Sequence, residues 1–219
     1  MTLVIATQQL TPETLALAAA ELARRDKDLA QILKTHGPPP MWGRSRGFST
    51  LIKIILEQQV SLASAASLFK RLRRNVVPFT PERVIELGEL HLRTQGLTRQ
   101  KAAYCVHLSQ AIVEKRLDLR RLSRMNDADA RTMLTGVKGL GLWSADVYLL
   151  MAMRRADIWP ADDLALAVAM TQIRRMETRL KAAELTEIAE AWRPYRSVAA
   201  RMLWQYYLAA RDRAKRSTN

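Results

Sequence analysis

Three glycines within six residues, Gly136, Gly139 and Gly141, constrain the fold of this chain more than any other feature. Apolar positions with helical spacing lie on both sides of them, over residues 128–134 and 142–153. Because glycine has no Cβ, these residues allow a sharp reversal between two helices and the close approach of another backbone. The unpaired N–H groups at the start of the second helix would then point outward and form an anion site suited to phosphate. The sequence therefore predicts a helical hairpin that grips phosphate.

Two adjacent carboxylates, Asp162 and Asp163, follow Pro160 about twenty residues after the glycines, at the start of another helical pattern. A phosphate grip held at a fixed distance from a carboxylate suggests chemistry on a nucleic acid. Taken alone, the two aspartates would more often cap the next helix and offset its dipole.

The charge of the chain favours a polyanionic partner. The 219 residues include 35 basic and 21 acidic side chains, a net charge of +14. Such a charge suits association driven by counterion release, although arginine-rich solvated faces would give the same composition. No apolar run is long enough to span a bilayer, and the N-terminus has no secretory pattern, so we expect a cytoplasmic protein, which a nucleic-acid partner would associate with the nucleoid.

The hydrophobic periodicity predicts an all-α chain, with residues 37–40 (Gly-Pro-Pro-Pro) as its clearest linker. The one strand-like stretch, Thr2 to Ala6, is too short to build a sheet. Leu51, Ile54, Ile55 and Leu62 are candidate core residues. We expect helices over residues 11–24, 26–35, 48–73 (one or two), 81–90, 98–115, 127–134, 142–153, 162–174, 183–191 and 195–211.

Further segments agree in order with one known family. They are Ile55-Leu56-Glu57-Gln58-Gln59-Val60-Ser61, Gly96 to Ala102, Thr135 to Ala145, Pro160 to Leu164, and Trp192-Arg193-Pro194-Tyr195-Arg196-Ser197 ending at Trp204. Together they resemble the helix-hairpin-helix DNA glycosylase superfamily, and within it the 3-methyladenine DNA glycosylase II family. The resemblance covers roughly residues 45 to 208. A lone glycine hairpin would be weak evidence, because such hairpins also occur in polymerases, ligases and recombination proteins.

The resemblance implies one glycosylase domain over residues 1–219, built from two helical lobes with an active-site cleft between them. Lobe one would comprise residues 1–45 and 155–219, and lobe two residues 46–154, with the hairpin at 128–153. Some family members carry an additional β-rich domain in front. Because only about 45 residues precede the matched region, we expect a minimal helical version without that domain, acting as a monomer.

The implied activity is excision of alkylated purines, such as 3-methyladenine and 7-methylguanine, from duplex DNA. The enzyme would flip the base out of the helix, hydrolyse the N-glycosidic bond and leave an abasic site for base excision repair. A glycosylase for deaminated or mismatched bases is one alternative, and a non-catalytic DNA-binding module is another.

Asp163 matches the essential carboxylate of the family, which faces the sugar of the extruded nucleotide and stabilises the positive charge that develops there. Asp162 then becomes the expected helix cap. Relatives that also cut the strand carry a lysine where this chain has Trp143, and that lysine forms a Schiff base with the sugar. Lys138 lies on the wrong side of the turn for this role, so the resemblance implies a monofunctional enzyme without lyase activity.

Trp143 and Trp204 correspond to aromatic residues of the family's base pocket, where indole faces attract cationic alkylated purines. Packing of the hairpin against the core is an equally good explanation for Trp143. Val147 stands where family members can have another aromatic residue, and the neighbouring Tyr148 points to a different face. This departure leaves the preferred lesion open.

Two loops match those that fill the gap left by a flipped base. In the first, Leu97 or Arg99 would be the wedge; in the second, Gln58 and Gln59 would approach from the opposite strand, although helix capping or interior hydrogen bonding explains these glutamines equally well. No catalytic cofactor is expected. The single cysteine excludes the four-cysteine iron–sulfur cluster of some relatives. The hairpin carbonyls of Gly136, Gly139 and Gly141 could hold a Na⁺ or K⁺ ion that bridges to DNA phosphate, beside Lys138.

Overall fold

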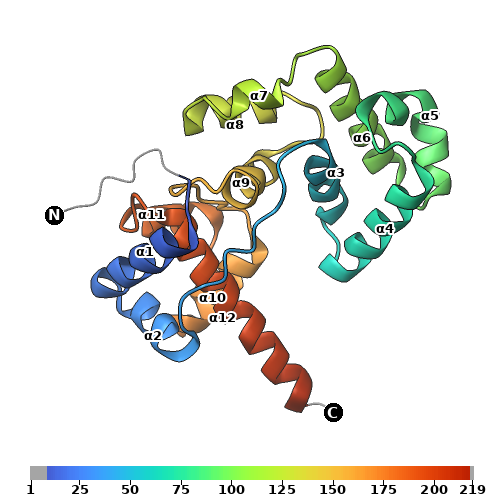
Figure 1. The fold of residues 1–219 in the computed structure, drawn as a ribbon. Helices are drawn as coiled ribbons and strands as arrows, with labels where there is room; N and C mark the ends of the chain where they lie inside the picture. The colour runs from blue at the N-terminus through green and yellow to red at the C-terminus, as the bar shows by residue number, and fades with distance from the viewer. Residues whose placement is uncertain (1–8, 218–219) are drawn as a thin grey trace. The chain divides into compact units, whose positions relative to one another are not determined.

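The computed structural model describes residues 9–217, and within this range its regular structure is helical, with one isolated antiparallel bridge between Gln9 and Arg155. This confirms the all-α prediction; the strand-like stretch Thr2 to Ala6 lies outside the described residues. The chain divides into two compact units, and the helices that belong to each are labelled in Figure 1. Unit 1 consists of Met1–Gly43 and Arg154–Asn219, and unit 2 of Arg44–Met153, close to the boundaries expected from the sequence.

Unit 1 is organised around its long C-terminal helix. This helix, α12, packs against α1, α2 and α10, and the side chains between them, such as Leu22, Ile32, Met170 and Leu203, are fully buried. The helices of unit 1 are α1 (Pro12–Arg25), α2 (Lys27–His36), α10 (Leu164–Ile173), α11 (Ala182–Glu190) and α12 (Arg196–Ser217).

The last helix is longer than expected. The sequence predicted an end at residue 211, but α12 continues to Ser217. The additional residues include Arg213, Ala214, Lys215 and Arg216, which are good helix formers, so the absence of apolar periodicity there did not mark the end of the helix. In the part of the chain that the structure describes, no helix is both long and apolar enough to cross a membrane.

Unit 2 is built around α3, which packs against α4, α6 and α9. Leu51, Ile54 and Ile55 are fully buried on α3, as predicted, whereas Leu62 begins α4 and is 60% exposed, so its assignment to the core was wrong. The helices of unit 2 are α3 (Phe48–Glu57), α4 (Leu62–Asn75), α5 (Pro81–Thr94), α6 (Arg99–Val113), α7 (Leu119–Leu122), α8 (Asp127–Thr135) and α9 (Leu142–Met151).

Most helices begin at a residue whose side chain accepts hydrogen bonds from the N–H groups of the first turn, which satisfies donors that have no partner within the helix. The residues that cap in this way are Thr11, Asp26, Ser61, Thr80, Thr98, Asp118, Asn126 and Asp163. Helices α3 and α9 differ, because their N-cap residues are Gly47 and Gly141 and no side chain caps them.

Candidate functional site

The predicted hairpin is present in unit 2, between α8 and α9. The amide of Gly136 donates to the Thr132 carbonyl at 3.0 Å, and the amide of Leu140 donates to the Val137 carbonyl at 3.0 Å, so the turn is closed by its own backbone. Val137 and Leu140 are buried and anchor the turn to the unit. No side chain caps the start of α9, and the binding of a phosphate there remains a prediction.

The three hairpin glycines meet different requirements. Gly139 has φ +101°, and a Cβ there would lie 2.4 Å from Cγ of Tyr104, a residue of α6. Gly141 has φ −76°, and a Cβ there would meet nothing within 4 Å. Gly136 has ordinary helical φ and ordinary contacts. Gly139 is therefore required by the fold itself, whereas Gly141 is not.

Gln58 holds the hairpin from the end of α3. Its Nε2 donates to the carbonyl of Gly139 at 2.8 Å and to the hydroxyl of Ser144 at 2.9 Å. Of the explanations that the sequence left open for this residue, interior hydrogen bonding is the one that the structure shows.

Lys101 of α6 holds the end of α3 and the loop that follows it, which carries Gln58. Its ammonium group donates to the carbonyls of Leu56 at 2.7 Å and Gln58 at 2.8 Å, and desolvation lowers the pKa of this lysine below its usual value. The sequence analysis missed Lys101 and Tyr104 as hairpin supports, because both are separated from the glycines in the chain. The only signal was that Lys101 falls within the family-like segment ending at Ala102.

The residues that were predicted to fill the gap left by a flipped base differ in how far they are exposed to solvent. Leu97 is only 4% exposed and lies in the core of unit 2, so it would have to leave the core to enter DNA, and this assignment does not fit the structure. Arg99 is exposed at the first position of α6. Gln59 is exposed in the loop after α3, with a left-handed φ of 57°. Arg99 and Gln59 are thus the members of the two predicted loops that reach solvent.

Two of the hairpin carbonyls that were expected to bind a monovalent cation take part in hydrogen bonds. The carbonyl of Gly139 accepts from Gln58, and that of Gly141 accepts from the amide of Ala145 at 3.0 Å. Cation binding at these carbonyls remains a prediction.

In unit 1, Asp163 is held at the start of α10. Its backbone amide donates to the Pro160 carbonyl at 3.0 Å, and its Oδ1 accepts from the amides of Ala165 at 3.0 Å and Leu166 at 3.1 Å. Asp163 is therefore the N-cap of α10, whereas Asp162, which was expected in that role, is exposed. The side chain of an N-cap residue folds back over the helix end, and Asp163 is the carboxylate placed to do so.

Trp204 of α12 reaches the same carboxylate. Its indole Nε1–H donates to Oδ1 of Asp163 at 3.0 Å, and both side chains are buried. The two residues are 41 positions apart in the chain, yet the packing of α10 against α12 brings them together. Trp204 was predicted as a pocket aromatic, and its polar contact with Asp163 was not foreseen.

The remaining pocket candidates belong to unit 2. Trp143 is partly exposed on the first turn of α9, and Lys138 is exposed on the turn itself. Val147 is buried and Tyr148 is directed inward, where its hydroxyl accepts from the amide of Gly47 at 3.0 Å. Burial raises the pKa of Tyr148. Tyr148 therefore does not replace the aromatic residue that is missing at position 147.

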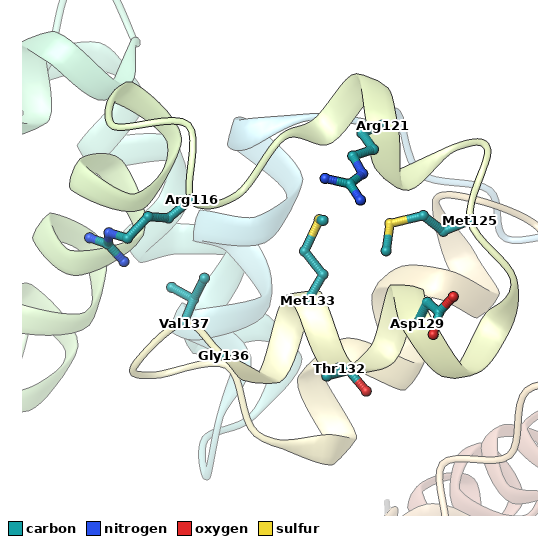
Figure 2. Close-up of a pocket in the computed structure, with 8 residues that line it drawn as sticks. All are labelled: Arg116, Arg121, Met125, Asp129, Thr132, Met133, Gly136 and Val137. Atoms are coloured by element: carbon teal, nitrogen blue, oxygen red, sulfur yellow. The ribbon is translucent and has the colours of Figure 1, made fainter.

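A separate cavity of about 530 Å³ lies beside α7 and α8 (Figure 2). Among the residues of the predicted site, only Gly136 borders it. Figure 2 shows Arg121, Met125 and Met133 directed toward one another across this cavity. Its lining residues are Arg116, Arg121, Met125, Asp129, Thr132, Met133, Gly136 and Val137.

Comparison with known families assigns the chain to a class of DNA repair proteins. The profile of the HhH-GPD superfamily base excision DNA repair proteins matches residues 52–194. The chain belongs to this family.

Individual relatives are consistent with this assignment. The chain is 24% identical over 212 residues to DNA-3-methyladenine glycosylase 1 of Schizosaccharomyces pombe, covering 94% of this chain and 93% of the relative. It is 28% identical over 170 residues to a DNA-3-methyladenine glycosylase of Bacillus subtilis, covering 72% of this chain but only 56% of that longer protein.

Among solved structures, the fold matches the S. pombe 3-methyladenine DNA glycosylase in complex with abasic DNA. The TM-score is 0.76 at 21% identity, covering 86% of this chain and 95% of that one.

Proposed function

We propose that this protein is a DNA glycosylase that excises alkylated purines from duplex DNA. The observation that carries the proposal is Asp163, a buried carboxylate held by two backbone amides and by the indole of Trp204. Asp163 also stands where the resemblance to the glycosylase family places the essential carboxylate, a role that a non-catalytic DNA-binding module would not need. The names of the relatives in S. pombe and B. subtilis support 3-methyladenine as the type of substrate.

The proposed reaction is hydrolysis of the bond between C1′ of the sugar and the purine nitrogen. As this bond breaks, its electron pair leaves with the base and positive charge develops on the sugar ring. The Asp163 carboxylate stabilises this charge, water adds its oxygen to C1′, and the proton of that water is released. A purine alkylated at N3 or N7, such as 3-methyladenine or 7-methylguanine in DNA, is already cationic and leaves readily, so no strong general acid is required of the protein for these lesions.

Duplex DNA would be held by unit 2, with the uncapped start of α9 on a phosphate. Gln59 and Arg99 are then the candidates to fill the gap left by the flipped base, because each is exposed at its loop. We propose that Trp143, on the first turn of α9, forms a wall of the base pocket.

The lesion class is tested with a panel of duplexes that carry 3-methyladenine, 7-methylguanine, ethenoadenine, hypoxanthine or a mismatched base. Each is incubated with the protein and then treated with alkali, which cleaves the strand at abasic sites. Cleavage confined to the alkylated duplexes supports the proposal. Cleavage confined to hypoxanthine or to the mismatch would assign the alternative glycosylase activity, and binding without any cleavage would assign a DNA-binding module.

The product should be an intact strand with an abasic site. A lyase step requires a lysine amine that forms a Schiff base with the sugar, and the hairpin position for it holds Trp143. Borohydride added during the reaction should therefore trap no covalent protein–DNA adduct. A clear adduct would overturn the monofunctional assignment, and loss of that adduct in Lys138→Ala would identify the amine.

The affinity for undamaged duplex should fall steeply with salt, because a chain of net charge +14 that contacts phosphates displaces counterions. The exposed Lys138 lies on the hairpin, so Lys138→Ala should lower the slope of log K against log salt by about 1. Lys181, an exposed lysine of unit 1 at the start of α11, is the matched control. Equal effects of Lys138→Ala and Lys181→Ala on the slope would contradict a phosphate grip at the hairpin.

A further inference from the structure

We infer that Trp204 is a positioning residue for Asp163, acting through its indole N–H and not only as an aromatic wall for the base. This inference rests on the proposed glycosylase function. The key contact is the hydrogen bond from Nε1 of Trp204 to Oδ1 of Asp163, at 3.0 Å between two buried side chains.

Three donors meet on one oxygen of this carboxylate. The amides of Ala165 and Leu166 and the indole of Trp204 all donate to Oδ1. Rotation of the carboxyl group about its bond to Cβ would move Oδ1 away from these donors, so each hydrogen bond opposes that rotation. The indole adds a restraint from a different helix, and because Oδ2 is fixed relative to Oδ1, this restraint also helps to set the direction of Oδ2. A carboxylate that must stabilise charge at a defined point gains from such preorganisation.

The same unit contains a second aspartate with nearly the same contacts. Asp26 is the N-cap of α2, its Oδ1 accepts from the amides of Asp28 and Leu29, and its Oδ2 accepts from Nε1 of Trp192 at 2.8 Å. In this pair the indole bonds to the oxygen that the cap does not use, whereas at Asp163 the indole bonds to the same oxygen as the cap. The Trp192–Asp26 pair therefore serves as an internal structural control.

Trp204→Phe is the decisive substitution, because it removes the N–H and keeps an aromatic ring. A hydrogen bond to a charged group is strong enough that its loss should reduce single-turnover base release about tenfold to hundredfold. The reduction should be the same for a cationic lesion, such as 7-methylguanine, and a neutral alkylated one, such as ethenoadenine, because the carboxylate acts on the sugar in both cases. If Trp204 acted only by cation–π stacking, the loss would be confined to the cationic lesion.

Trp192→Phe is the matched control. It removes an equivalent indole-to-aspartate hydrogen bond, so it should lower the free energy of unfolding by a similar amount and change the rate of base release less than about twofold. A loss of rate in both variants would mean that the effect of Trp204→Phe is only structural. Such a result would overturn the inference.

The hydrogen bond from Trp204 to Asp163 can also be detected by NMR, in an experiment that does not depend on base release. In the ¹H–¹⁵N NMR spectrum, the indole resonance of Trp204 should move on Asp163→Asn, and that of Trp192 should not. The inference would be contradicted if the indole chemical shift of Trp204 did not change on Asp163→Asn. It would also be contradicted if Trp204→Phe released both lesions at the wild-type rate. If the wild-type protein released no base from any duplex, the proposed function would fall, and the NMR comparison would still decide whether Trp204 holds Asp163.

Discussion

Asp163→Asn should abolish base release while the protein remains folded and bound to DNA. The substitution removes the negative charge that stabilises the developing positive charge on the sugar, and loss of one such preorganised group lowers rates by about a hundredfold or more. Asparagine caps helices about as well as aspartate, and its carbonyl oxygen can accept the bonds that Ala165 and Leu166 now donate. The measurement is single-turnover release of 3-methyladenine, together with DNA affinity and thermal unfolding.

Asp26→Asn and Asp162→Asn are the controls for this variant. Asp26 repeats the cap of Asp163 at another helix of the same unit, and Asp162 is the exposed neighbour. Both variants should keep wild-type base release. An inactive Asp162→Asn beside a nearly normal Asp163→Asn would show that the essential carboxylate is the other aspartate. DNA affinity of Asp163→Asn should stay equal or rise, because a negative charge near phosphate is removed.

Gly139→Ala should destabilise unit 2 strongly, by about 3 kcal/mol in the free energy of unfolding. The new Cβ would overlap the ring of Tyr104 at 2.4 Å, and φ +101° is unfavourable for alanine. The overlapping atoms include Cβ and Cγ of Tyr104, which lie next to its backbone, and Gln58 holds the carbonyl of Gly139, so relief of the overlap requires the backbone to move. Chemical denaturation gives the loss of stability, and DNA affinity should fall with it.

Gly141→Ala is the matched comparison, two residues further along the hairpin. Here φ is −76° and the Cβ would meet nothing in the protein, so stability should change by less than about 1 kcal/mol. DNA affinity should nevertheless fall, and equally for all sequences, because the methyl group occupies the approach to the first amides of α9. Normal DNA affinity in a folded Gly141→Ala variant would contradict a phosphate grip at this helix start.

The elements that could be predicted from the sequence are those marked by local chemistry. Glycine spacing located the hairpin, and capping residues with apolar periodicity placed most helix starts within a residue or two. The end of α12 was missed because Arg213 and its neighbours continue a helix without burying anything. Leu62 and Leu97 were misjudged for the same kind of reason, since a leucine in a loop or first turn carries no local signal for its burial.

The supports of the candidate site depend on tertiary contacts. Lys101 and Tyr104 reach the loop and the hairpin from α6, and Trp204 reaches Asp163 from α12. These pairs lie tens of residues apart, and no spacing rule connects them. Asp163 shows most clearly what could not be predicted from the sequence. The sequence predicted Asp162 as the helix cap and Asp163 as the catalytic carboxylate, whereas the structure shows that Asp163 is the cap. The catalytic role of this residue remains a prediction.

The central claim is tested most directly by chromatography of the bases released from methylated duplex DNA. The wild-type protein should liberate free 3-methyladenine or 7-methylguanine in a time-dependent manner, and Asp163→Asn should release no more than the spontaneous background. If the wild-type protein bound this DNA but released neither base, it would not be a glycosylase for alkylated purines. If Asp163→Asn released them at the wild-type rate, Asp163 would not be the carboxylate that stabilises charge on the sugar.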